Sequence, residues 1–367
     1  MPIVWRYLLR SYFQVFLLCV SAFISVLLVL RFQEIARFAT AGTPPMSVAL
    51  FALLQIPYIL PIAVPVSCLI AAMLLFQKLS HTHELTAFRA CGLGLSQIAA
   101  PLLFAGFLLT LVNFTIASEL APRCRGMSKA LICKAASDNP LFLLQRESLV
   151  KLKNAYFEMR VLKSGKYAED VLLILKNSSS DRLAVVSAKE LNLNDDLLQG
   201  AQVSIISSVD PKSEGYDHLV IENQAEMNMQ AANLSQFTQT ADWSSSYDYM
   251  PLRMILARDA LVKKKKNKTG FISKSAQLEI ARRISISLAA LTFTCIGVAF
   301  GTQISRNRSK KGVVSAIFLA SLFLVCFISA KSMKHAPLMS TAIYLLPHPL
   351  ILLISLRSMK SLQGGVE

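Results

Sequence analysis

The sequence contains six apolar runs, each long enough to cross a lipid bilayer as a helix. The runs are Ser11–Leu30, Met46–Phe76, Gln97–Ala117, Ile284–Gly301, Gly312–Ala330 and Ser340–Leu356. A bilayer core of about 30 Å needs roughly 17–25 apolar residues in one helix. The chain is also 54% hydrophobic, with a mean hydropathy of +0.49, which is too apolar for an ordinary soluble protein. We therefore predict a helical membrane protein with six transmembrane helices.

Prolines and polar residues inside the runs predict local departures from a plain apolar helix. Pro57, Pro61 and Pro65 lie within Met46–Phe76, so we expect that helix to be kinked or tilted. Asn113 lies near the end of the third run. We expect its side chain to make a hydrogen bond to a neighbouring helix rather than to line a path for a substrate.

The segment of about 119–275, between the third and fourth runs, has the composition of a separate domain. It begins with a polar stretch of helical character, Ala121–Ser137, and then breaks into six β-rich pieces separated by Gly, Asn, Asp, Ser and Pro turn residues. The pieces are Ser148–Lys153, Ala155–Leu162, Asp170–Lys176, Arg182–Leu193, Ala201–Ser207 and His218–Met229. Strands at this spacing suggest a sandwich or jelly roll. A basic helical linker, Pro251–Lys268, leads back to the fourth run.

The predicted fold is therefore an α-helical membrane protein with an inserted all-β, jelly-roll-like domain. Residues 1–118 hold the first three spans, residues 119–275 hold the inserted domain, and residues 276–367 hold the last three spans.

The charge pattern predicts which parts of the chain face the cytoplasm. Only three of the 22 acidic residues, Glu34, Glu84 and Glu367, lie outside residues 119–282, whereas 15 of the 38 basic residues do. Lys and Arg in the short connections favour cytoplasmic termini and place the inserted domain outside, although Lys263–Lys266 opposes this count. The basic excess lies at the edges of the spans, where anionic headgroups attract it, so we do not expect nucleic acid as a partner.

A short polar segment, Ser80–Leu95, separates the second and third runs and reads SHTHELTAFRACGLGL. Thr82 is the predicted N-cap of a surface helix, Glu84 lies in its first turn, and Gly92 is expected to end it. Such a helix, held at the membrane surface between two spans, could receive a push from a partner.

Two interpretations of this surface helix are open from spacing alone. Leu85 and Phe88 are three residues apart and share one face, which makes the helix half apolar and able to receive a push. Glu84 and Arg89 could equally be solvated loop charges with no partner.

No pattern typical of an enzyme or a metal site occurs in the sequence. Gly165-Lys166 is followed by Tyr167, and no GxxxxGK[ST] phosphate-binding loop is present. Ser, His and Asp show neither nucleophile-elbow nor zinc-helix spacing. The cysteines form no CxxC motif, although Cys124 and Cys133 could pair in an oxidising compartment. We therefore expect no catalytic residue, no metal and no cofactor.

Four basic residues lie in the two short connections that the charge pattern places outside, namely Arg31, Arg37, Lys331 and Lys334. They could be interfacial anchors whose long side chains reach from apolar surroundings toward water. They could instead ring an outward-facing cavity and bind an anionic ligand through charge-assisted bonds. The residues alone leave both interpretations open.

Several short stretches of the chain have a recognisable form. Trp5–Arg10 reads WRYLLR, Glu84–Leu93 reads ELTAFRACGL, Asn139-Pro140 begins the β-rich segment, and Ala281-Arg282-Arg283 precedes the fourth span. Together, and over nearly the whole chain, they resemble the LptF/LptG family of lipopolysaccharide export permeases. Cys91 and the basic loop after the fifth span resemble LptF slightly more than LptG. The chain departs from the family in lacking a proline early in the fourth span and in ending soon after the sixth.

The resemblance implies one permease subunit of an ABC-type exporter in the bacterial inner membrane, with lipopolysaccharide as its substrate. The implied partners are a second LptF/LptG-type permease, a dimer of the LptB-type ATPase that hydrolyses the ATP, an LptC-type single-span protein and, indirectly, an LptA-type periplasmic bridge. The alternative is a membrane-anchored envelope scaffold whose β-domain binds another envelope protein without transport.

The resemblance also implies roles for individual residues. The helix within Ser80–Leu95 becomes a coupling helix in a groove of the ATPase, with Glu84 as its principal polar contact. The residues that shape this fit are Leu85, Phe88, Arg89 and Gly92. Arg37, near the outer end of span one, is the first candidate for contact with lipid phosphates, followed by Arg31, Lys331 and Lys334.

Overall fold

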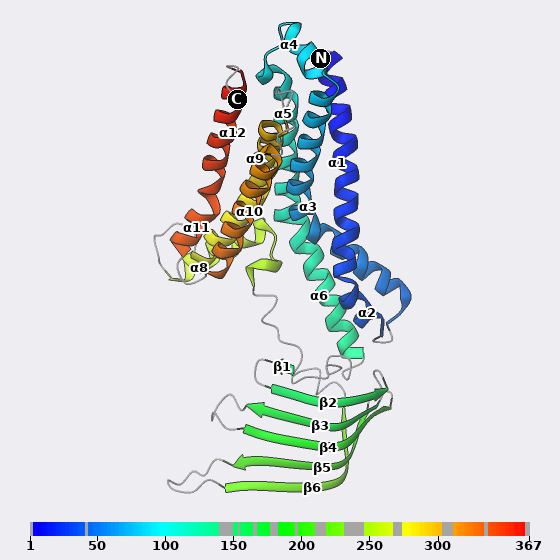
Figure 1. Ribbon diagram of the computed structural model, residues 1–367. Helices are drawn as coiled ribbons and strands as arrows, with labels where there is room; N and C mark the ends of the chain where they lie inside the picture. Colours follow the sequence, from blue (N-terminus) through cyan, green and yellow to red (C-terminus); the bar gives the residue numbers. More distant parts are fainter. Residues whose placement is uncertain are drawn as a thin grey trace. The chain divides into compact units, whose positions relative to one another are not determined.

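Figure 1 shows a computed structural model of the chain. It describes residues 3–40, 43–138, 150–152, 155–163, 167–176, 183–194, 197–209, 218–230, 246–266, 274–302, 311–333 and 337–363. The chain forms two compact units. The first consists of Met1–Leu30, Leu54–Gly126 and Ser246–Glu367, and the second of Arg31–Leu53 and Met127–Ser245.

The described residues include six helical segments long and apolar enough to cross a membrane, which confirms the predicted number of spans. The segments are α1 (Ile3–Leu30), α3 (Pro45–His81), the continuous run of α5 (Leu95–Thr115), η1 (Ile116–Leu120) and α6 (Ala121–Asp138), then α9 (Lys274–Gly301), α10 (Lys311–Ser332), and α11 (Pro337–Leu345) with α12 (Pro347–Gln363). Shorter elements are α2 (Phe32–Thr40), α4 (Glu84–Ala90), η4 (Tyr247–Tyr249) and α8 (Leu252–Lys266).

Helix α3 runs unbroken for 37 residues through three internal prolines. Because Pro65 has no N–H, the carbonyl of Pro61 lacks the donor that an α-helix normally supplies four residues later. The side chain of Asn113 supplies one instead, with its Nδ2 3.2 Å from the Pro61 oxygen and 3.3 Å from the oxygen of Ile286 on α9. The predicted interhelical hydrogen bond of Asn113 is thus confirmed, and it joins three helices.

Helix α9 is the most buried of the spans and contacts α5, α10, α11 and α12. It also approaches the backbone of α3 closely. A Cβ atom added at Gly297 would lie only 2.7 Å from the carbonyl oxygen of Leu69 and from the Cβ of Ala72. A Cβ at Gly301 would lie 3.0 Å from the oxygen of Met73. Small residues allow helix backbones to approach in this way within a membrane.

Helices α1 and α10 are the least buried of the spans. Their outer faces expose large apolar side chains, including Leu18 and Val29 on α1 and Phe318 and Ile328 on α10. Faces of this kind are stable only against lipid or another apolar surface.

The second unit carries one antiparallel sheet, in which the six described strands pair in sequence order (Figure 1). The strands are β1 (Val150–Leu152), β2 (Ala155–Lys163), β3 (Tyr167–Lys176), β4 (Leu183–Asn194), β5 (Leu197–Val209) and β6 (His218–Gln230). Their positions follow the predicted β-rich pieces, and the prediction of an all-β insertion is confirmed. In detail the described strands form a single meander, because the short links between them suit antiparallel neighbours.

One face of this sheet has a buried row that sets its register. Val171 of β3 lies opposite Ala188 of β4, which in turn lies opposite Val203 of β5, and all three are buried. A shift of one residue would turn these side chains to the other face.

Candidate functional site

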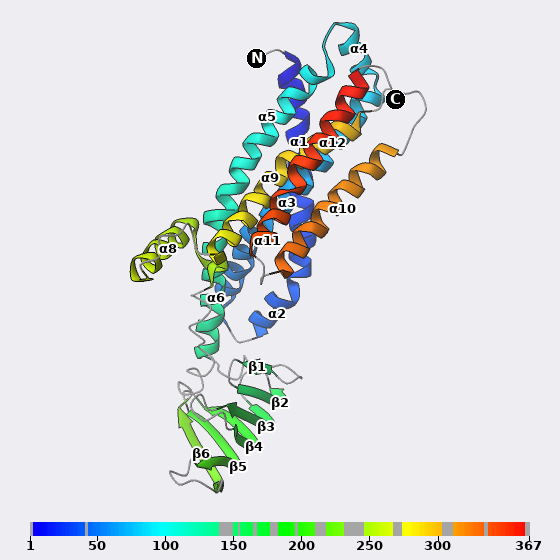
Figure 2. The same cartoon turned by 90° about the vertical axis from the view of Figure 1, so that its left-hand side faces the viewer.

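The first candidate site is helix α4, at the end of the first unit that also holds the amino terminus of α1 and the carboxyl terminus of α12 (Figures 1 and 2). Leu85 is 2% exposed and packs in a buried cluster with Leu8, Leu79 and Met359. Phe88 is partly buried against the same cluster. The face that Leu85 and Phe88 share therefore packs against the bundle of this chain.

The start of α4 differs from the prediction. The N-cap is His83, in the left-handed region at φ 58°, and no side chain caps the helix. The predicted N-cap at Thr82 is wrong because α3 continues to His81, and the Thr82 hydroxyl lies 3.0 Å from the Lys78 carbonyl of that helix.

Glu84, the predicted principal contact, is held from two sides. Its Oε1 accepts a hydrogen bond from the Thr82 hydroxyl at 3.0 Å, and its Oε2 accepts one from the Tyr7 hydroxyl of α1 at 3.1 Å. The carboxylate is thereby tied to α1 as well as to the turn between α3 and α4. This tie fixes the position of the charge relative to the bundle.

Helix α4 ends in a Schellman motif at Gly92, where the sequence predicts the end of the helix. Gly92 has φ +83°, its N–H donates to the Arg89 carbonyl at 3.0 Å, and the N–H of Leu93 donates to the Phe88 carbonyl at 3.1 Å. Leu93 also packs against the cluster that holds Phe88. Since both ends of α4 are fixed, the helix presents its remaining, more exposed face as a rigid surface.

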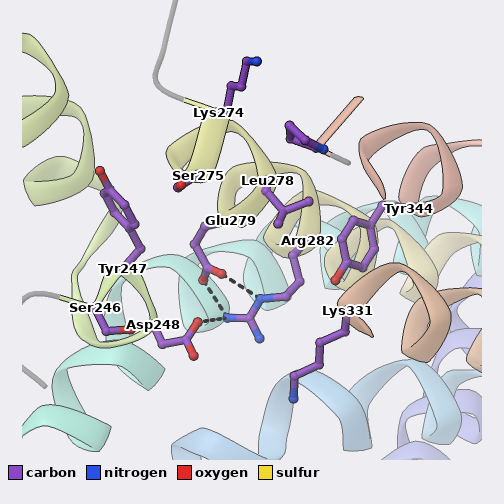
Figure 3. A pocket seen from close by; sticks show the side chains of 11 residues that line it. Ser246, Tyr247, Asp248, Lys274, Ser275, Leu278, Glu279, Arg282, Lys331 and Tyr344 are labelled. Atoms are coloured by element: carbon purple, nitrogen blue, oxygen red, sulfur yellow. Dashed lines mark hydrogen bonds and ion pairs between the residues drawn. The ribbon is translucent and has the colours of Figure 1, made fainter. Parts of the chain in front are cut away.

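The second candidate site is a cavity of about 520 Å³ at the opposite end of the same unit (Figure 3). It lies at the start of α9, and its lining residue Arg282 is about 25 Å along that helix from Ala299, which belongs to the cluster beneath α4. The lining residues are Ser246, Tyr247, Asp248, Lys274, Ser275, Leu278, Glu279, Arg282, Lys331, Pro337 and Tyr344.

Arg282 is the central charge of this cavity. Its Nε donates to Glu279 Oε2 at 2.8 Å and its Nη2 to Glu279 Oε1 at 2.6 Å, while Asp248 Oδ1 lies 3.4 Å from Nη2. In Figure 3 the two carboxylates lie on one side of the guanidinium, and Tyr344 and Lys331 lie on the other. Among the described residues, the side chain of Lys331 makes no hydrogen bond or ion pair.

A second cavity of about 120 Å³ adjoins the first and shares Asp248, Arg282 and Lys331 with it. Arg125 lines this cavity, 5.0 Å from the centre of the Tyr58 ring and 4.7 Å from that of Tyr249. Around the two cavities five basic side chains face two acidic ones: Arg125, Lys274, Arg282, Arg283 and Lys331 against Asp248 and Glu279. The region therefore carries a net positive charge.

The predicted lipid-contact residues divide between the two units. Lys331 lines both cavities of the first unit. Arg31 belongs to the second unit, where its Nη1 pairs with Glu34 at 2.6 Å. Arg37 lies in α2, but its side chain is outside the described residues, and so is Lys334.

The sequence analysis did not single out the acidic residues that line the cavities at the start of α9. Ala281-Arg282-Arg283 was noticed only as part of a resemblance, and neither Glu279 nor Asp248 was singled out. The signal that could have identified Glu279 is its position four residues before Arg283, at the start of the fourth span. Among the described residues no group of three His, Cys, Asp or Glu side chains could hold a metal ion, and Cys124 is a free thiol.

Comparison with known proteins bears on both sites. The model of the family described as lipopolysaccharide export system permease LptF/LptG matches residues 6–361, which is nearly the whole chain and includes both α4 and the cavities at the start of α9. None of the curated proteins compared with the chain matches it. A multi-pass protein of this family lies in the inner membrane and works with other Lpt components. With its six spans, its inserted β-sheet and a match along almost its full length, the chain belongs to the LptF/LptG family of lipopolysaccharide export permeases.

Proposed function

We propose that this permease is one subunit of an ATP-driven exporter that extracts lipopolysaccharide from the inner membrane and passes it to a periplasmic bridge. ATP is hydrolysed by a separate LptB-type ATPase dimer. The further partners are a second LptF/LptG-type permease, an LptC-type single-span protein and, indirectly, an LptA-type bridge. The observation that carries this proposal is α4, a short helix fixed at both ends and anchored in the bundle by Leu85.

Helix α4 has the properties that a coupling element needs. Its buried face joins α1, α3, α5, α9 and α12 through one apolar cluster, so a force on its outer face reaches all five helices. Glu84 and Arg89 supply opposite charges at its two ends, where the helix dipole favours them. The ATPase contacts this outer face, and its closure on ATP displaces α4 and the helices beneath it.

The substrate sets the requirements for the rest of the path. Lipopolysaccharide is an anionic amphiphile, and exposing its acyl chains to water costs about 0.8 kcal/mol per CH₂ group. The exposed apolar faces of α1 and α10, completed by the second permease, shield these chains. Lys331 at the positive outer end meets the phosphates, and Arg31, Arg37 and Lys334 extend the basic rim.

The sidedness of the two sites follows from the charge pattern. Lys and Arg in the short connections favour α4 and both termini in the cytoplasm, where the ATPase acts. The cavities at the start of α9 and the inserted β-sheet then face the periplasm.

The proposal is tested with the complex purified through a tag on this chain and placed in vesicles that contain lipopolysaccharide. We expect an ATPase and a second permease to co-purify, and lipopolysaccharide to pass to a soluble periplasmic acceptor only when ATP is present. A chain that co-purifies with no ATPase and moves no lipid, while its sheet binds an envelope protein, would support the scaffold alternative.

Lys331→Glu is expected to lower photocrosslinking to lipopolysaccharide about tenfold. A charge-assisted bond to a phosphate contributes about 1.5–3 kcal/mol, and the reversed charge also repels the ligand. The measurement is crosslinking from a photoreactive residue placed at Met333, which is exposed beside Lys331. Lys360→Glu, the same change at the other end of the bundle, is the control and should crosslink as the wild type does. Equal crosslinking in both variants would return Lys331 to the role of an interfacial anchor.

A further inference from the structure

A single guanidinium holds two of the four chain segments that connect the first unit with the second. Arg283 of α9 is 3% exposed. Its Nη1 donates to the Ser118 carbonyl at 3.1 Å, and its Nη2 donates to the carbonyls of Tyr247 at 3.0 Å and Met250 at 2.8 Å. Ser118 lies before Met127, where the chain enters the second unit for the second time, and Tyr247 and Met250 lie just after it returns at Ser246.

The segment that leaves toward the second unit is itself irregular. Ser118 belongs to η1, a π-helix of five residues inside the otherwise continuous helix from Leu95 to Asp138. Such insertions have longer-range backbone bonds and are frequent at functional positions. The Ser118 hydroxyl is buried and makes no hydrogen bond to any described residue. The bond from Arg283 to the carbonyl is therefore the polar contact that ties this turn to α9.

Glu279 holds the guanidinium in the required orientation. Its Oε1 accepts from the Nε of Arg283 at 2.8 Å, one turn along α9, and its side chain is 8% exposed. The planar fork of arginine can serve a carboxylate on one edge and carbonyls on the others, whereas a lysine ammonium is a single point charge. We call Arg283, Glu279 and the three carbonyls the Arg283 clasp.

The clasp lies on the helix best placed to carry motion along the bundle. Toward its other end α9 packs against α3 at Gly297 without room for a side chain, and Ala299 shares the buried cluster of Leu85 under α4. A displacement that starts at α4 can reach the clasp along either α5 or α9.

We propose that Arg283 is a positioning residue for export, which moves the two segments that flank Met127–Ser245, the part of the second unit that carries the sheet, together with α9 when α4 is displaced. This inference rests on the function proposed above. Without the clasp, the π-helix and the returning turn at Tyr247–Tyr249 separate from α9, so ATP is hydrolysed without delivery of lipid to the sheet.

The test compares Arg283→Lys with Arg123→Lys in the complete complex in vesicles. Arg123 lies one turn beyond Ser118, but it is 56% exposed and makes only a surface pair with Glu119. We expect Arg283→Lys to keep ATP hydrolysis within about twofold of wild type and to lower the lipopolysaccharide delivered per ATP at least about tenfold, because lysine replaces at most part of a network of charged hydrogen bonds. Arg123→Lys should keep the wild-type ratio. An unchanged ratio in Arg283→Lys, or an equal fall of hydrolysis and delivery, would overturn the proposal.

A second measurement does not depend on transport. Nitroxide labels introduced as unnatural amino acids at Leu120 and Met254, which are both exposed, report the separation of the two segments that the clasp joins. We expect one narrow distance distribution in the wild type and in Arg123→Lys, and a broad one in Arg283→Lys. A narrow distribution in all three would overturn the clasp. A broadened Arg283→Lys in a complex whose wild type moves no lipid would instead refute the proposed export function and leave the clasp standing as a structural contact.

Discussion

Glu84→Ala is expected to abolish lipopolysaccharide export while the chain still inserts and folds. The carboxylate is the anionic end of α4 and is held toward solvent by hydrogen bonds from Tyr7 and Thr82. A lost charged hydrogen bond at a partner surface costs about 1.5–3 kcal/mol, which corresponds to a loss of binding of roughly ten- to a hundredfold. The measurement is the amount of ATPase that co-purifies with the variant, together with lipid delivery by the same complex.

Two further variants separate the charge of Glu84 from its position. Glu84→Gln keeps the shape and removes the charge, so co-purification should fall nearly as far as in Glu84→Ala. Tyr7→Phe keeps the charge and removes one tether, so it should cause a smaller loss. Glu119→Ala, which removes an acid at the other end of the bundle, should behave as the wild type. Wild-type co-purification in Glu84→Ala would count against the coupling role of α4.

Gly297→Leu is expected to prevent the stable packing of α9 against α3. The new Cβ would lie 2.7 Å from the backbone oxygen of Leu69 and 3.1 Å from the backbone nitrogen of Met73, and neither can move without shifting α3. Overpacking of this kind typically costs 1–3 kcal/mol and occasionally more, and here rigid backbone receives the clash. We expect little folded protein in detergent and a clearly lower melting temperature for what remains.

The milder Gly297→Ala should show the same effect to a smaller degree, since its Cβ meets the same atoms. Gly126→Leu is the matched control, because a Cβ at Gly126 has no neighbour within 4 Å. The melting temperature of Gly126→Leu, measured by size-exclusion chromatography after heating, should equal that of the wild type. Equal melting of the Gly297 and Gly126 variants would mean that α3 and α9 can separate at no cost.

Glu84, Gly297 and the Arg283 clasp lie on helices that pack against one another, from α4 to the start of α9. Glu84 is on the surface of α4, and Gly297 lies where α9 packs closely against α3. Arg283 holds the segments around Ser118 and Tyr247 to the start of α9. Glu84→Ala should abolish export without lowering the melting temperature, whereas Gly297→Leu should lower the melting temperature and lose export as a consequence. The two variants thus separate coupling from packing.

The sequence by itself determined the elements of this protein. A span is encoded by some twenty consecutive apolar residues, and a strand by a β-rich piece between turn residues, so both can be predicted from neighbouring residues alone. The end of α4 could also be predicted from neighbouring residues, because a left-handed residue after a helix favours glycine, and Gly92 occupies that place. The spacing of Leu85 and Phe88 predicted their shared face, but not that this face is buried against the chain's own bundle.

Only the tertiary structure decided how those elements bind one another. Whether Thr82 caps α4 or closes α3 depended on where α3 ends, and the structure extends it to His81. Asn113 reaches the Pro61 carbonyl across 52 residues, and Arg283 reaches the Ser118 carbonyl across 165. Patterns of apolar and turn residues act over a few positions, whereas the partner of a buried polar group is set by the packing of whole helices, which no short stretch of sequence encodes.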